Sequence, residues 1–218
     1  AGEHYVSAFP IITPLLAVPI YFFPIILGMA VSWENLIFLS HLSAAVIVSL
    51  SGGFIYLLLK KRFKLKHTQS LLLTAIYLFG TVNLSMLSQS LWQHGTVQFF
   101  IILGWYFLLP LFKPNVKIDK KYVFYSFLSG ILFGLALLSR PTAGLSLIFS
   151  FLLLIYNCFE NLRKKFVLAL SYFGGVLFNL IFFVWYNSKY YLGIENQGYT
   201  NQIFENWLSP FPEGFLGV

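Results

Sequence analysis

Long hydrophobic runs fill this chain, and short clusters of polar or charged residues separate them. A helix needs about 20 mainly apolar residues to cross a membrane, and about six runs approach or reach that length. The pattern predicts an all-α fold, a polytopic membrane helix bundle of about six transmembrane helices. The predicted crossings are Leu36–Leu59, Gln69 to about Leu87, Thr96–Phe112, Val123–Leu138, Leu145–Phe159 and Phe166 to about Tyr186.

The segment Phe9–Ala30 is apolar enough to cross a membrane, but it carries Pro10, Pro14, Pro19 and Pro24. Prolines remove backbone donors from a helix, and no basic residue flanks the segment to mark a cytoplasmic end. We therefore expect an outer-surface, membrane-hugging helix or helix pair here rather than a seventh crossing.

The whole chain is predicted to be one membrane domain in three parts. Residues 1–34 are expected to be the end of an outer loop, and residues 35–187 the transmembrane bundle. Residues 188–218 are expected to form an outer loop or re-entrant segment, because Gly and Pro interrupt their apolar half. The chain starts at Ala1 without a signal-peptide pattern and stops in an apolar run at Val218, which predicts an internal fragment of a longer protein.

Composition supports the membrane assignment. Hydrophobic residues make up 58% of the 218 residues and charged residues 10%, with a mean hydropathy of +0.78. Soluble domains carry about 25% charged residues, and a globule of this size has too little core to hide so much apolar side chain. Soluble enzymes, disordered chains and disulfide scaffolds are therefore excluded, and the single cysteine, Cys158, is expected to be inert.

The net charge of +7 has a topological meaning, because the basic residues are clustered between apolar runs. Short basic loops mark the cytoplasmic side of a membrane protein, so nucleic acid is not the expected partner. Arg140 and Lys189 then fall on the opposite, extracytoplasmic side, and we predict a multi-pass protein of the inner or plasma membrane whose active face points outward. The three basic tracts are Lys60, Lys61, Arg62, Lys64 and Lys66; Lys113, Lys117, Lys120 and Lys121; and Arg163, Lys164 and Lys165.

Arg140 is the most informative polar residue on the predicted outer side. It stands between two short apolar runs, and Pro141 ends the first of them. Its planar fork of donors suits a phosphate group, although an arginine that snorkels to lipid headgroups explains the same position.

His94 follows Trp92 and Gln93 at the outer end of a predicted helix. It suits a diphosphate or a sugar hydroxyl, although the sequence shows no partner for it. With 3.6 residues per turn, polar residues of the preceding run share one helix face, which either lines a watery cavity or bonds neighbouring helices. We favour helix packing for this stripe, which consists of Ser85, Ser88 and Gln89.

Other motifs add little chemistry. The histidines are scattered without metal-ligand spacing, and no phosphate-binding loop or nucleophile elbow is present. No cofactor is evident, and a requirement for a divalent metal stays open. Gly130 and Gly134 form a small-xxx-small pair that predicts close helix contact, whereas the Gly52-Gly53 and Gly174-Gly175 pairs either pack or loosen their helices.

Four blocks, taken together and in order, resemble bacterial integral-membrane glycosyltransferases of the GT-C superfamily, in the polyprenyl-phosphate-sugar-dependent branch related to protein mannosyltransferases. The blocks are Tyr5–Pro19, Ser90–Gly95, Leu138–Thr142, and Gly198-Tyr199 followed by Trp207–Gly217. The resemblance implies a bundle of many membrane helices and a lipid-linked sugar donor, usually a polyprenyl phosphate. It also implies sugar transfer outside the cytoplasm.

The resemblance also guides the choice of site residues. The family's catalytic carboxylate usually lies earlier in the first outer loop, so no residue here inherits that role, and Glu3 is only a remote candidate. The substrate-binding candidates are Arg140, His94, Gln93 and Tyr199, with membrane lipid as a second partner.

The leading hypothesis is an inverting sugar transferase that uses a polyprenyl-phosphate-linked donor. Its acceptor, whether glycan, lipid or protein, is left open by the sequence. A transporter or lipid flippase is the alternative, against which the sequence shows no discontinuous helices or internal repeats. A non-catalytic assembly subunit is the third reading.

Overall fold

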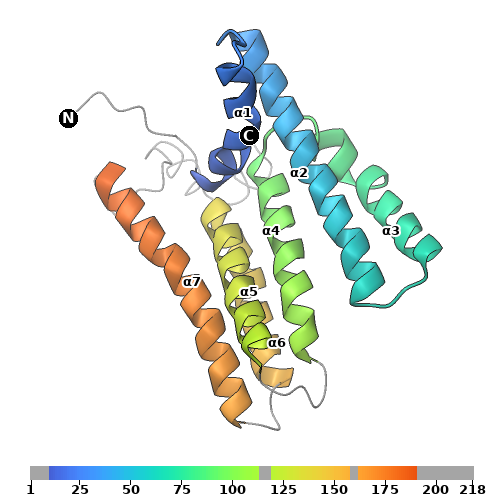
Figure 1. Ribbon diagram of the computed structural model, residues 1–218, viewed down its shortest axis with the longest axis vertical. Coiled ribbons are helices and arrows are strands. Elements are labelled where there is room, and N and C mark those ends of the chain that lie inside the picture. Colours follow the sequence, from blue (N-terminus) through green and yellow to red (C-terminus); the bar gives the residue numbers. More distant parts are fainter. Residues whose placement is uncertain (1–9, 113–118, 158–161, 191–218) are drawn as a thin grey trace, which may run out of the picture.

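The computed structural model describes residues 10–112, 119–157 and 162–190, which are helical apart from short turns and contain no strand (Figure 1). The predicted all-α class is confirmed for this part of the chain. The elements are α1 (Ile12–Ile26), α2 (Trp33–Lys61), α3 (His67–Phe79), the π-helix η1 (Asn83–Leu87), α4 (Gln93–Leu108), the 3-10 helix η2 (Leu109–Phe112), α5 (Lys120–Ser139), the 3-10 helix η3 (Pro141–Ala143), α6 (Gly144–Asn157) and α7 (Leu162–Tyr190).

Four helical segments are long and apolar enough to cross a membrane: Trp33–Lys61, Gln93–Phe112, Lys120–Ser139 and Phe166–Tyr190. Their exposed faces are apolar as well, where a helix in water would carry polar residues. On α7 the exposed apolar side chains recur every three or four residues, so they form one stripe. This surface indicates a membrane protein, and the stripe consists of Phe166, Leu170, Phe173, Leu177, Ile181 and Val184.

Two further apolar helices are shorter than a full crossing. Helix α6 has 14 residues and follows η3 directly. Helix α1 has 15 residues, with Pro19 and Pro24 inside it, and at 1.5 Å per residue it is about 22 Å long, less than the roughly 30 Å of a hydrocarbon core. The predicted alternative of a helix pair within Phe9–Ala30 is replaced by this single helix.

The run from Gln69 to Leu87 was predicted as one continuous helix, and this is wrong. Helix α3 ends at Phe79, and η1 follows as a π-helix. A continuing α-helix would give the carbonyl of Tyr77 to the N–H of Thr81. Instead this carbonyl accepts from the Thr81 hydroxyl at 2.7 Å and from Asn83 Nδ2 at 2.9 Å, so side chains replace the helical hydrogen bond.

The helices alternate in direction, so the last residues of α2, α4 and α6 and the first residues of α3, α5 and α7 lie at one end of the bundle (Figure 1). We call this the basic end, because the helix residues there include Lys60, Lys61, Lys120, Lys121 and Arg163. Arg140 and Lys189 lie at the opposite end, the Arg140 end, as the clustering of basic residues predicted.

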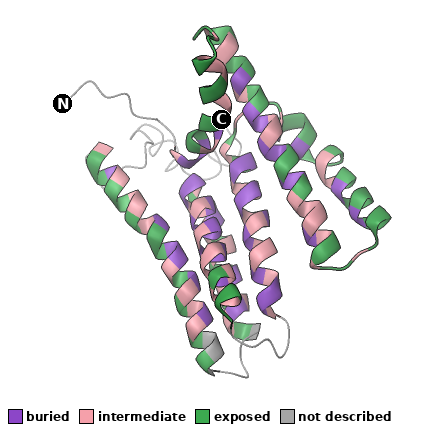
Figure 2. Ribbon diagram, in the orientation of Figure 1, coloured by how far each residue is buried: buried purple, intermediate pink, exposed green. Residues whose placement is uncertain are grey.

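Helix α5 is the centre of the bundle, because it packs against α4 on one side and α7 on the other. Buried residues follow the faces that these helices turn to each other (Figure 2). A Cβ atom on Gly130 would fall on the backbone carbonyl of Tyr172, and one on Gly175 would fall on the carbonyl of Phe127. The predicted packing role of Gly130 is therefore confirmed, and Gly175 has the same role.

Polar side chains tie the closely packed helices together. Ser126 Oγ donates to the carbonyl of Leu168 at 2.7 Å, and Asn179 Nδ2 donates to the carbonyl of Ile131 at 3.0 Å. On the other side of α5, Ser129 Oγ donates to the carbonyl of Gly104 at 3.0 Å. Each donor satisfies a buried polar group away from water, as a membrane interior requires.

Arg62 has a structural role at the basic end. Its Nε donates to the carbonyl of Tyr106 at 2.9 Å, and its guanidinium lies 4.2 Å from the centre of the Tyr106 ring. In a regular helix this carbonyl would accept from residue 110, but Pro110 has no N–H. Arg62 therefore satisfies a carbonyl that a proline leaves free, and it links the end of α2 to the end of α4.

We expect Arg62→Ala to lower the free energy of unfolding by roughly 1–2 kcal/mol, because it removes a charge-assisted hydrogen bond and a cation–π contact. Thermal unfolding of the purified protein in detergent measures this change. Lys61→Ala is the matched control, because Lys61 is exposed. Equal melting temperatures for the two variants would contradict the structural role of Arg62.

Candidate functional site

Arg140 occupies the break between α5 and η3. Because residues before proline avoid the helical region, Arg140 is extended, with φ −159° and ψ 125°. Its N–H still donates to the carbonyl of Ala136, and its carbonyl accepts from Ala143, both at 3.0 Å. The backbone is thus fixed on both sides, while the side chain leaves the axis of α5.

His94 lies at the start of α4, close to Arg140 in space. Trp92 is extended, with φ −84° and ψ 146°, so α4 begins at Gln93 and His94 is its second residue. The His94 side chain is exposed. Free N–H groups and the helix dipole give this terminus a partial positive charge, so the side chain stands where an anion is stabilised.

The two side chains form a pair. Arg140 Nη1 lies 2.7 Å from His94 Nδ1 and 2.5 Å from His94 Nε2. Since the guanidinium is always charged and only donates, the imidazole that accepts from it is neutral and offers one lone pair. A guanidinium has five N–H donors, and this contact uses one of them. The pair therefore orients the arginine while leaving donors for another anionic or polar group.

The helices end at different heights at the Arg140 end of the bundle. Helices α2 and α7 have 29 residues each, whereas α5 has 20. At 1.5 Å per residue the difference is about 13 Å. Both α2 and α7 extend beyond α5 at the Arg140 end, as Figure 1 shows. The Arg140–His94 pair lies at the ends of the shorter helices, between these longer ones.

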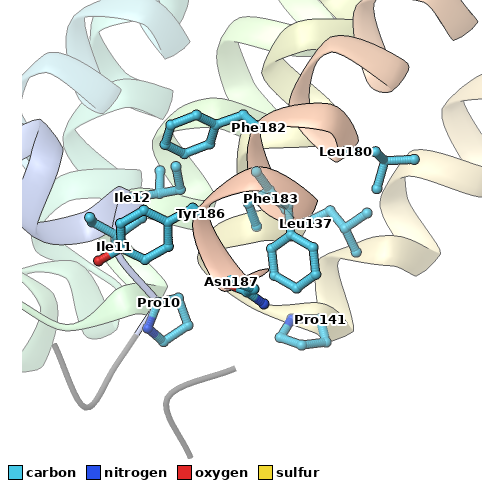
Figure 3. A pocket seen from close by; sticks show the side chains of 11 residues that line it. Pro10, Ile11, Ile12, Leu137, Pro141, Leu180, Phe182, Phe183, Tyr186 and Asn187 are labelled. Atoms are coloured by element: carbon cyan, nitrogen blue, oxygen red, sulfur yellow. The ribbon is translucent and has the colours of Figure 1, made fainter. Parts of the chain in front are cut away.

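An apolar cavity of about 220 Å³ lies beside the chain that carries Arg140, although neither Arg140 nor His94 is among the residues that line it. The start of α1, the last turn of α5 and the C-terminal part of α7 form its walls (Figure 3). Leu137, Leu138 and Pro141, which flank Arg140 in the chain, belong to the lining. Small-molecule pockets commonly measure about 300–1,000 Å³, so this cavity has room for one segment of a longer apolar chain. The walls opposite α5 are Pro10, Ile11, Ile12, Leu180, Phe182, Phe183, Tyr186 and Asn187.

The other predicted site residues are not part of the Arg140–His94 contact in the described structure. Gln93 is partly exposed and precedes His94 at the start of α4. Glu3 and Tyr199 lie outside the described residues, as does Cys158. Among the described residues, no group of three or more His, Cys, Asp or Glu side chains is placed to hold a metal ion.

The polar stripe before His94 does not form the predicted helix face. Ser88 Oγ donates to the carbonyl of Leu84 at 2.9 Å, and Gln89 Nε2 donates to the same carbonyl at 3.3 Å. These side chains satisfy their own backbone, and Ser85 is exposed. The predicted bonding to neighbouring helices is therefore wrong for Ser88 and Gln89, which follow η1 and bond to the carbonyl of Leu84 in their own segment.

A separate polar cluster lies between α2, α3, η1 and α4. Gln98 Nε2 donates to the Tyr77 hydroxyl at 2.5 Å, and Asn83 Nδ2 donates to the hydroxyl of Thr81 at 3.0 Å. Asn83 is almost fully buried. Because these bonds connect three elements, the cluster fixes the turn that leads from η1 towards His94.

Sequence reasoning missed the cavity. Its walls come from three segments far apart in the chain, and apolar residues such as Phe182 and Phe183 are ordinary in a membrane helix. No local signal distinguishes them from residues that face lipid.

Comparisons of this chain with protein-family models, curated proteins and solved structures found no match.

Proposed function

We propose that this protein is a membrane-embedded glycosyltransferase of GT-C type. It transfers a sugar from a polyprenyl-phosphate-linked donor to an acceptor on the extracytoplasmic face of the membrane. The observation that carries the proposal is the solvent-accessible Arg140–His94 pair together with an apolar cavity that is lined by the chain neighbours of Arg140, Leu138 and Pro141. Such a site offers a cation to a phosphate and an apolar surface to the lipid chain attached to it.

The chemistry needs charge stabilisation at the leaving group. The acceptor oxygen forms a bond to the anomeric carbon of the sugar, the bond from that carbon to the phosphate oxygen breaks, and a general base takes the acceptor proton. Negative charge then grows on the polyprenyl phosphate, which Arg140 stabilises with its free donors. His94 acts as a positioning residue, because it holds the guanidinium. We assign the general base to none of the described residues.

The proposed topology has six crossings, with α1 on the outer surface. Helices α2, α4, α5 and α7 provide four of them, α3 with η1 provides one, and η3 with α6 provides one. The basic end then faces the cytoplasm, in the inner or plasma membrane. This arrangement puts Arg140 at the level of outer headgroups, because a 20-residue helix is about as long as the hydrocarbon core is thick.

One observation favours the alternative, a lipid flippase or transporter. The sequence showed no discontinuous helix, but α3 ends at Phe79 and η1 begins at Asn83. Transporters often build their binding sites from broken helices. The described part of this break, however, is closed by the polar cluster of Tyr77 and Asn83, so we prefer the transferase.

The test uses the full-length protein in liposomes, with polyprenyl phosphate that carries a radiolabelled sugar and with extracted cell-envelope acceptors. Label that moves into an acceptor supports the transferase. If the labelled lipid crosses the bilayer while the sugar stays attached, the flippase replaces it. If neither occurs with any donor, the proposal is overturned and the assembly-subunit reading stands.

A further inference from the structure

The turn between α2 and α3 carries several positive charges, most of which have no role in holding the described helices together. Five basic residues lie within seven positions of the chain, from Lys60 to Lys66. The turn is firmly hydrogen-bonded to the end of α2, because the N–H groups of Phe63 and Leu65 each donate at 3.2 Å to carbonyls of its last turn. Lys64 has a left-handed backbone, with φ 57°, which reverses the chain direction. The charges are therefore held on a rigid tip.

Within the described part of the chain, only one of these five basic residues contacts another helix of the bundle through its charged group. Arg62 is bound to Tyr106 through its hydrogen bond and ring contact, which ties the turn to α4. The other four side chains are exposed, and none forms an ion pair with a residue in the described ranges. They are Lys60, Lys61, Lys64 and Lys66.

The residues around these lysines have the character expected at a membrane surface. Phe63 lies among them and is 56% exposed. An exposed aromatic ring between lysines at the end of a membrane helix can enter the acyl boundary while the charges stay at headgroup level. Within the described ranges, Asp119 is the acidic residue at this end of the bundle, so the protein supplies little opposite charge.

We propose that the α2–α3 turn is a binding site for the headgroups of anionic phospholipids in the leaflet at the basic end. The four lysines supply the charge, Phe63 anchors the turn, and Arg62 holds it in place through Tyr106. This site is at the opposite end of the bundle from Arg140, and the proposal stands whether or not the protein transfers sugar.

The test counts lipids bound to the purified full-length protein. The protein is equilibrated in detergent with equal amounts of phosphatidylglycerol and phosphatidylcholine, and native mass spectrometry reports their ratio on the protein. We expect phosphatidylglycerol to be enriched on the wild type. Lys64→Gln with Lys66→Gln should lower the enrichment by about fivefold per lysine, the factor that corresponds to one lysine near an anionic surface.

Matched variants separate charge from fold. Lys64→Arg with Lys66→Arg should keep the enrichment, because the charge is retained. Lys120→Gln with Lys121→Gln removes equal charge from the start of α5 and should change it less. For the unaltered protein, raising the ionic strength from about 0.05 to 0.5 M should reduce the enrichment through screening. An enrichment that is absent, insensitive to salt, or equal in the Gln and Arg variants would overturn the proposal.

Discussion

Arg140→Ala should reduce sugar transfer by the full-length protein by about 10²-fold or more, with little change in its expression or melting temperature. The reason is that a preorganised donor to a developing oxyanion contributes roughly this factor to kcat. Arg140 is partly exposed and its own backbone bonds hold the turn, so loss of the side chain should spare the fold. Initial rates of label transfer, measured beside thermal unfolding, give the two quantities.

Two further variants distinguish the parts of the Arg140–His94 pair. Arg140→Lys keeps the charge but loses the planar fork, so it should recover only part of the activity. His94→Ala should weaken transfer less than Arg140→Ala, because the imidazole orients the guanidinium without replacing its charge. Turnover of Arg140→Ala at the wild-type level would remove Arg140 from the mechanism and leave the snorkelling explanation.

Gly130→Ala and Gly175→Ala should each lower the free energy of unfolding by roughly 1–3 kcal/mol, the usual cost of forcing extra atoms into a packed interior. At both positions the new methyl group would meet a backbone carbonyl of the facing helix rather than a flexible side chain. Helices α5 and α7 would have to separate, which would also strain the hydrogen bond from Asn179 to Ile131. Melting temperatures in detergent measure the loss.

Gly53 provides the matched control for these two glycines. It lies in the middle of α2, and a Cβ atom there meets nothing within 4 Å. Gly53→Ala should therefore be neutral or slightly stabilising, because alanine is the better helix former. If Gly53→Ala and Gly130→Ala have the same effect, close packing of α5 and α7 does not explain the stability of the bundle.

The features that sequence predicted well depend on local pattern. The clustering of basic residues predicted which helix ends lie at the same end of the bundle, and Pro141 marked the end of α5. The spacing of Gly130 and Gly134 identified the packing face of α5. These signals survive because hydropathy, charge and chain-breaking residues act within a few positions of where they occur.

The features that sequence missed depend on contacts between distant residues or on competing hydrogen bonds. His94 and Arg140 are 46 positions apart, and only the packing of α4 on α5 brings them together. Arg62 and Tyr106 are also far apart in the chain, and the packing of α2 beside α4 brings them into contact. The break after Phe79 was missed for another reason. In the sequence, Thr81 and Asn83 look like ordinary polar residues within an apolar run, yet their side chains donate to the Tyr77 carbonyl, which would otherwise accept a helical hydrogen bond.

The short helix α3 has a consequence for the lipid around the protein. Its 13 residues are about 20 Å long, it packs mainly on α2, and its other face exposes Leu72, Ile76 and Phe79. In the proposed topology η1 completes this crossing, but the regular apolar face of α3 alone is shorter than the hydrocarbon core and favours local thinning, whereas the longer α7 favours a thicker bilayer or a tilt. The proposed crossings therefore differ in hydrophobic length around the bundle, and lipids with shorter acyl chains should gather beside α3.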